Sequence, residues 1–94
     1  MQFSKELREG VASGRITVSF RLWQRPHAKV GSRYQVGSGS IEVDDVRLIP
    51  FHAITKADVR RAGESDRESL RCRAAHAGPI DDDTMLYMVE FHPV

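Results

Sequence analysis

The chain has 94 residues, of which 40% are hydrophobic and 29% are charged. This length and composition are typical of one folded globular domain, predicted to span residues 1–94, and they exclude an intrinsically disordered protein, which would carry fewer apolar residues and more net charge. The formal net charge of +1 indicates no particular partner, because it averages over segments of opposite sign.

Three features bear on where the protein works. No apolar run approaches the roughly 20 residues that a membrane-spanning helix needs. Residues 1–10 lack the apolar segment of a secretory signal peptide. Cys72 is the only cysteine, which excludes an internal disulfide. We therefore expect a cytoplasmic protein without membrane contact.

Residues 3–13 are predicted to form a short helix. Apolar side chains recur every four positions at Phe3, Leu7 and Val11, and Gly14 stands where a helix commonly ends. Residues on one helical face are three or four positions apart, so this spacing gives the helix one face to bury.

Residues 16–22 alternate strictly between apolar and polar side chains, which predicts a half-buried strand. The apolar face would consist of Ile16, Val18, Phe20 and Leu22. The opposite side, here called the polar strand face, would consist of Thr17, Ser19 and Arg21.

A second and a third strand are predicted at residues 33–36 and 40–48, joined by a glycine-rich turn at 37–39. The apolar residues of the third strand are odd-numbered before Asp44-Asp45 and even-numbered after it. A β-bulge or a break in the strand at residues 44–45 would restore a single buried face.

Two short helices and a last strand complete the chain. Thr55 with Asp58, and Ser65 with Glu68, have the spacing of capping boxes, and the second helix would run to about Ala77. The last strand, at residues 85–91, is apolar on both faces except for one glutamate, so it should be central and covered on both sides. This order predicts an α+β fold with a mostly antiparallel, curled sheet or small open barrel.

Four segments together resemble the ASCH domain, a relative of the PUA fold. They are residues 14–21 (GRITVSFR), 29–31 (KVG), 54–58 (ITKAD) and 87–91 (YMVEF), and the likeness extends over nearly the whole chain. The resemblance implies a small PUA-like open β-barrel of mostly antiparallel strands with flanking short helices, serving as an RNA- or nucleotide-binding module.

The resemblance also implies a possible hydrolase. Some small ASCH proteins hydrolyse the acetyl amide of N4-acetylcytidine with a lysine, a threonine and a glutamate, and others are ribonucleases. The threonine position falls on Ser19, the glutamate on Glu68 and the lysine on Ile16. Because an isoleucine cannot carry a proton, the residue at this position argues against the amidohydrolase reaction in this chain. Glu68 would equally be explained by its place in a capping box.

Residues 15–33, here called the basic segment, contain five cations and no acid. The cations are Arg15, Arg21, Arg25, Lys29 and Arg33, with Trp23 and His27 among them. One interpretation is a surface that follows phosphates beside a stacking aromatic ring. The alternative is a solvated rim neutralised by the acids of residues 42–45.

These observations favour a domain that binds RNA or a modified nucleotide in a basic cleft. The predicted ligand contacts are Thr17, Ser19, Arg21, Trp23, Arg25, Lys29 and Tyr87. The first alternative is a small hydrolase in which Ser19 and Glu68 are catalytic, and the second is a protein-interaction domain. We predict no cofactor and no metal site, because His27, His52, His76 and His92 show no ligand spacing.

Overall fold

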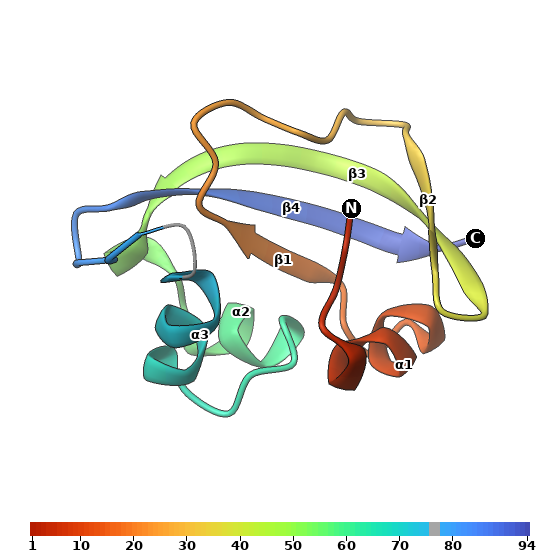
Figure 1. Ribbon diagram of the computed structural model, residues 1–94, viewed down its shortest axis with the longest axis horizontal. Helices are drawn as coiled ribbons and strands as arrows, with labels where there is room; N and C mark the ends of the chain where they lie inside the picture. Colours follow the sequence, from red (N-terminus) through yellow and green to blue (C-terminus); the bar gives the residue numbers. More distant parts are fainter. Residues whose placement is uncertain (76–77) are drawn as a thin grey trace.

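The computed structural model describes residues 1–75 and 78–94 (Figure 1). Four strands form one antiparallel sheet in the order β1-β4-β3-β2; in Figure 1 the helices lie below it and the β1–β2 loop arches above it. The strands are β1 (Val18–Arg21), β2 (Arg33–Val36), β3 (Gly39–Pro50) and β4 (Met85–Pro93). The helices are α1 (Lys5–Ser13), the 3₁₀ helix η1 (Phe51–Ala53), α2 (Lys56–Arg61) and α3 (Arg67–Ala74). Within the described residues, no helix is both long and apolar enough to cross a lipid bilayer.

The sheet confirms the α+β class and the antiparallel pairing, but it does not close into a barrel. Among the described strands, β1 pairs only with β4 and β2 pairs only with β3, so these two strands are open edges. Each edge strand has only four residues, and α1 packs against β2, β3 and β4 where a closed barrel would need the edges to meet. The predicted open β-barrel is therefore corrected to an open sheet.

β4 is a central strand covered on both faces, as its apolar sequence predicted. Leu86 and Met88 belong to a hydrophobic cluster shared with α2 and α3, here called the helix core. Val89 and Phe91 belong to a cluster shared with α1, β2 and β3, here called the α1 core. Because the neighbours Met88 and Val89 lie in different cores, β4 separates the two.

A β-bulge explains the change of phase in the hydrophobic pattern of β3. The strand pairs with β4 at Val43 and again at Asp45, and Asp44 is the extra residue between them. Val43 before the bulge and Val46 after it therefore both pack in the α1 core, although one is odd-numbered and the other even. Of the two irregularities predicted at residues 44–45, a bulge or a break, the structure contains the bulge.

β1 is shorter than the predicted strand at residues 16–22. Val18 and Phe20 pack in the helix core, but Ile16 packs in the α1 core, so the three do not share one face. The reason lies at Thr17, whose backbone N–H donates to the carbonyl of Arg61 at 3.0 Å. The pairing of β1 with β4 begins at the next residue, Val18.

The capping box predicted at the start of α2 is present, but the one predicted for α3 is wrong. The N-cap of α3 is Asp66, whose side chain accepts a hydrogen bond of 2.7 Å from the N–H of Ser69. Ser65 and Glu68 make no capping box, because the helix begins one residue later than their spacing requires. The helix end predicted near Ala77 lies outside the described residues.

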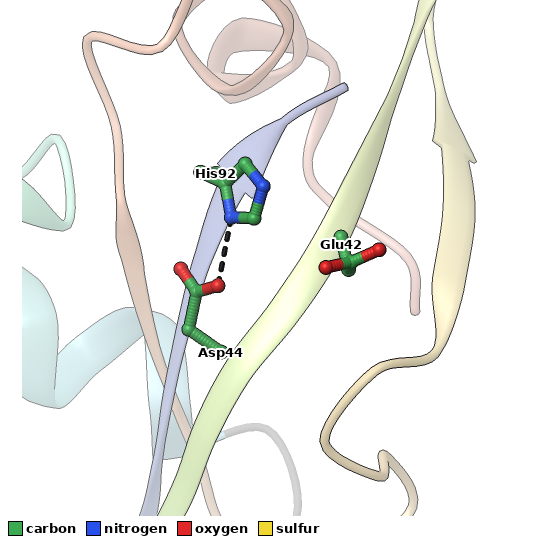
Figure 2. A group of neighbouring side chains, drawn as sticks. All are labelled: Glu42, Asp44 and His92. Carbon is green, nitrogen blue, oxygen red and sulfur yellow. Dashed lines mark hydrogen bonds and ion pairs between the residues drawn. The ribbon is translucent and has the colours of Figure 1, made fainter.

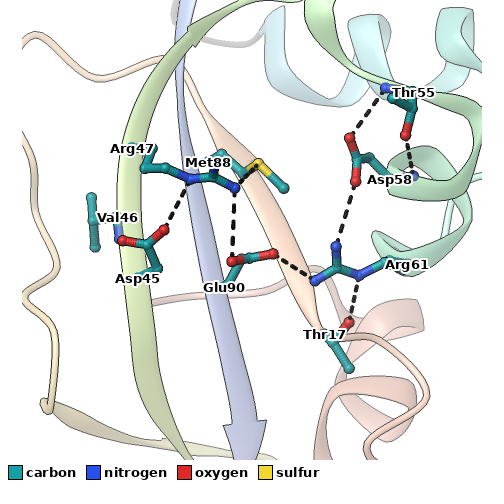
Figure 3. A network of polar contacts seen from close by, with 9 residues as sticks. All are labelled: Thr17, Asp45, Val46, Arg47, Thr55, Asp58, Arg61, Met88 and Glu90. Carbon is teal, nitrogen blue, oxygen red and sulfur yellow. Dashed lines mark hydrogen bonds and ion pairs between the residues drawn. The ribbon is translucent and has the colours of Figure 1, made fainter.

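A polar network ties α2 to the sheet (Figure 3). Arg61 of α2 donates to Thr17 Oγ1 at 3.1 Å and to Glu90 of β4 at 2.8 Å, and it pairs with Asp58 at 3.4 Å. Glu90 also lies 3.8 Å from Arg47 of β3. This carboxylate is therefore shared by two arginines from different elements.

Candidate ligand pocket

A cavity of about 320 Å³ opens at the free edge of β1, between that strand, residues 2–7 and α3. We call it the β1 pocket. Its apolar wall includes Phe3, Val18, Phe20 and Leu70. Its polar lining consists of Gln2, Ser4, Ser19, Arg21, Glu64 and Arg73. The lining thus brings two guanidinium groups and one carboxylate against an apolar wall.

Arg21 is the cation of the pocket lining that has no carboxylate partner among the described residues. Its Nε donates to Ser19 Oγ at 2.7 Å, its Nη2 donates to the carbonyl of Gln2 at 2.6 Å, and its Cζ lies 4.9 Å from the centre of the Phe3 ring. Burial lowers the pKa of the Arg21 guanidinium, because desolvation disfavours the charged form. No carboxylate within residues 1–75 and 78–94 lies at ion-pair distance from it, so the pocket keeps a positive charge there.

Glu64 and Arg73 form the second charged pair of the pocket. The Glu64 side chain is only 6% exposed, and its Oε2 accepts from Arg73 Nε at 2.8 Å. Arg73 also donates to Ser4 Oγ and to Glu6, at 2.8 and 3.0 Å. These bonds raise the pKa of Arg73, with the one to Glu64 contributing most. One guanidinium is thus neutralised across the pocket, and Arg21 supplies the excess charge.

β1 offers backbone groups to the pocket as well. In an antiparallel edge strand, alternate residues direct their N–H and C=O groups away from the sheet. β1 is such an edge, and it lines the pocket along its free side. A flat heteroaromatic ring could therefore meet apolar surface, a hydroxyl and strand backbone groups in the same place.

Comparison with solved structures identifies the fold. An ASCH-domain structure from Lactobacillus crispatus JV V101 superposes with a TM-score of 0.78 at 16% identity, covering 99% of this chain and 76% of that chain. A protein of Enterococcus faecalis V583 from the DUF984 family superposes with a TM-score of 0.72 at 15% identity, covering 95% and 67%. The chain has the ASCH-domain fold. No family model matches the sequence, and no curated protein matches it either.

On this ASCH fold, the polar strand face is divided between two environments. Ser19 and Arg21 line the β1 pocket, together with Val18 and Phe20 from the alternate positions of the same edge strand. Thr17 lies outside the pocket lining, because its hydroxyl accepts from Arg61 in the network at α2. The predicted convergence of all three side chains on one cleft is therefore corrected to two of them.

The aromatic residues predicted to stack on a ligand lie beside Arg21, outside the pocket lining. The ring of Trp23 is 5.1 Å from His27 and 6.0 Å from Tyr87, centre to centre. Arg21 Cζ lies 5.9 Å from the Trp23 ring. Arg21 thus connects the β1 pocket with this aromatic group.

The other cations of the basic segment do not converge on the pocket. Arg25 and Lys29 are exposed in the β1–β2 loop, and Arg15 is exposed after α1. Arg33 pairs with Glu42 at 3.0 Å. This ion pair agrees with the alternative interpretation of the basic segment, a solvated rim neutralised by the acids of residues 42–45. Only Arg21 of the five lines the pocket, and the second pocket cation comes from α3.

Glu68, expected as the acidic site residue, lies outside the β1 pocket lining. Its side chain is 73% exposed and pairs with Arg71 at 3.3 Å, while Glu64 holds the buried position. Sequence reasoning missed Glu64 and Arg73. The signal for Glu64 is faint: it follows Gly63, whose φ of +81° turns the chain after α2, and nothing in the sequence says which way the next side chain points.

Proposed function

We propose that this ASCH-fold domain binds RNA or a modified nucleotide, with a base in the β1 pocket and an anionic group on Arg21. The observation that carries the proposal is the partly buried guanidinium of Arg21, which lines a pocket and has no carboxylate partner among the described residues. An anionic ligand would supply the missing partner, and phosphate fits the geometry of a guanidinium group.

The size and surroundings of the pocket support a small aromatic ligand. A volume of about 320 Å³ is at the lower end of the range for small-molecule sites, which suits one base better than several. Trp23 beside Arg21 offers a stacking surface for a neighbouring base, and the exposed Arg25 and Lys29 offer contacts to further phosphates. Ser19 would contact the base edge.

A binding titration at two salt concentrations tests this function. The ligands are short single-stranded RNAs and the free mononucleotides, followed by filter binding and by Trp23 fluorescence. We expect RNA affinity to fall steeply with salt, as contacts to several phosphates require. Arg21→Gln should weaken binding at least about tenfold, since a hydrogen bond to a charged group contributes about 1.5–3 kcal/mol.

Arg60→Gln is the matched control for this titration. Arg60 is an exposed arginine of α2 outside the β1 pocket lining, so its replacement removes the same charge without touching the pocket. We expect it to retain most of the affinity. Wild-type protein that binds neither RNA nor nucleotide at low salt would contradict the proposal and favour a protein-interaction domain.

One observation favours hydrolysis as a second candidate function: Ser19 and Glu64 line the same pocket. However, the hydrogen bond to Ser19 Oγ comes from Arg21, which donates and cannot take a proton from a nucleophile. Ile16 lines the pocket at the position where the resemblance places a lysine. Incubation with N4-acetylcytidine and with single-stranded RNA tests this candidate; turnover that Ser19→Ala abolishes would establish it.

A further inference from the structure

A second group of chemistry-bearing side chains lies on β3 and β4, outside the β1 pocket. It consists of Glu42, Asp44 and His92, here called the strand cluster (Figure 2). One ligand atom from each residue lies within 4.8 Å of the others, and His92 Nδ1 is 2.7 Å from Asp44 Oδ1. Figure 2 shows the imidazole and the Asp44 carboxylate facing each other, with Glu42 beside them on β3.

Strand pairing and the bulge position the cluster. Glu42 stands directly opposite His92 in the β3–β4 register, and the Cβ atoms of such a pair are about 4.5–5.5 Å apart. Asp44 is the extra residue of the bulge, and its side chain reaches His92 from the neighbouring position. All three groups stand on paired strands, which hold side chains more precisely than loops do.

The charges around the cluster leave Asp44 without a strong cation. Arg33 forms an ion pair with Glu42 at 3.0 Å, and Arg47 forms ion pairs with Asp45 at 2.9 Å and with Glu90 at 3.8 Å. Within the described part of the chain, the partner of Asp44 is His92. With a neutral imidazole, two carboxylates of the cluster therefore face one guanidinium, and a cation is favoured there.

We propose that the strand cluster binds a divalent transition-metal ion of the zinc class, with water completing the coordination. One imidazole and two carboxylates are a donor set that zinc accepts, whereas Mg²⁺ and Ca²⁺ prefer oxygen donors alone. The side chains of Glu42, Asp44 and His92 are 30%, 48% and 45% exposed, so both the ion and its water ligands have access.

The geometry also indicates what limits the affinity. Ligand bonds of about 2.0–2.2 Å place the donor atoms of a tetrahedral zinc site about 3.3 Å apart, closer than the 4.8 Å limit that contains these atoms now. His92 Nδ1 and Asp44 Oδ1 are closer than this, at 2.7 Å, because they share a hydrogen bond. Zinc would displace the proton of that bond and separate the two atoms slightly, whereas Glu42 is the group that has to approach. Its ion pair with Arg33 opposes this movement.

Calorimetric titration of the tag-free protein with Zn²⁺ tests the proposal, because a histidine tag would bind zinc itself. We expect one site, and we expect His92→Ala and Asp44→Asn each to weaken it at least about tenfold, since even the loss of a group that only orients a metal ligand costs about 10–100-fold in affinity. His52→Ala is the matched control, because His52 is exposed and lies outside the strand cluster. Mg²⁺ should not compete.

Two further measurements distinguish this site from casual binding to surface histidines. The imidazole ¹⁵N resonances of His92 should shift with one equivalent of Zn²⁺, and those of His52 should not. Arg33→Gln should strengthen zinc binding severalfold, because it frees Glu42. Zinc binding that His92→Ala leaves unchanged, or shifts confined to other histidines, would overturn the proposal. If His92→Ala fails to fold, Asp44→Asn provides the same test, and unchanged zinc affinity in that variant would overturn the proposal equally.

Discussion

Glu64 and Glu68 lie four positions apart but differ in burial, so replacing them should affect the stability of the protein differently. Glu64 is 6% exposed and bonded to Arg73, whereas Glu68 is 73% exposed beside Arg71. Breaking a buried pair leaves a charge without its partner, but a surface pair contributes little. Replacing each glutamate by glutamine therefore distinguishes a buried residue of the pocket from a surface residue.

We expect Glu64→Gln to lower the free energy of unfolding by about 1–3 kcal/mol, a range reduced for the partial exposure of Arg73. Glu68→Gln should change it by less than about 0.5 kcal/mol, as surface substitutions do. Urea denaturation followed by circular dichroism measures both. Equal losses at the two positions would contradict the assignment of Glu64 to the buried site.

At the same scale, a local pattern pointed to only two of the polar residues that line the β1 pocket. The alternation of β1 places Ser19 and Arg21 on one face, but Val18 and Phe20 line the pocket as well, because β1 is an edge strand. Glu64 and Arg73 enter the pocket only when α2 and α3 pack on the sheet, and no local pattern encodes that contact. The resemblance to the ASCH domain placed the acidic site residue at Glu68, which is a surface residue outside the pocket lining.

At the scale of elements, the start of α3 depends on one aspartate. Asp66 is the N-cap, and its bonds to Ser69, above all from the backbone N–H, hold the pKa of its carboxyl below the ordinary aspartate value. A carboxyl with a lowered folded-state pKa stabilises the protein above the unfolded-state pKa, and this contribution is lost as the pH falls through the folded-state pKa.

Asp66→Ala should therefore lower the urea midpoint near neutral pH, and the difference from wild type should shrink as the pH falls below the ordinary aspartate pKa. Ser65→Ala removes the residue that the sequence spacing favoured as the cap, and it should leave the midpoint nearly unchanged at every pH. Denaturation curves of the three proteins at neutral and acid pH measure this. A larger effect of Ser65→Ala than of Asp66→Ala would contradict this assignment and support the predicted capping box, with Ser65 as the N-cap.

Secondary-structure elements could be predicted where a local sequence pattern reflects how the element packs in the fold. The two-sided apolar sequence of β4 predicted a central strand, and the change of phase in β3 predicted the bulge at Asp44. Barrel closure was not predictable in this way, since it depends on whether β1 and β2 meet. Here α1 packs against β2 and two neighbouring strands, and the two edges stay open.

At the scale of the whole molecule, a chain of polar contacts runs between the surroundings of the two proposed sites (Figure 3). Asp45 follows the bulge and pairs with Arg47, which reaches Glu90; Arg61 then joins Glu90 to Thr17, just before β1. Contact alone does not couple two sites, because coupling needs an element with two arrangements that both ligands bias. β4, which lies between the two regions, is buried on both faces, and we expect it to keep a single arrangement.

We therefore expect the β1 pocket and the strand cluster to bind independently. RNA titrations with the zinc-loaded protein and with the protein in chelator should give dissociation constants within about twofold, since distant sites without shared partners usually couple by less than about 0.5 kcal/mol. Arg21→Gln should leave zinc affinity unchanged, and His92→Ala should leave RNA affinity unchanged. If zinc shifts RNA affinity severalfold, Glu90→Gln tests whether the polar chain carries the effect, because it removes the carboxylate that joins Arg47 to Arg61.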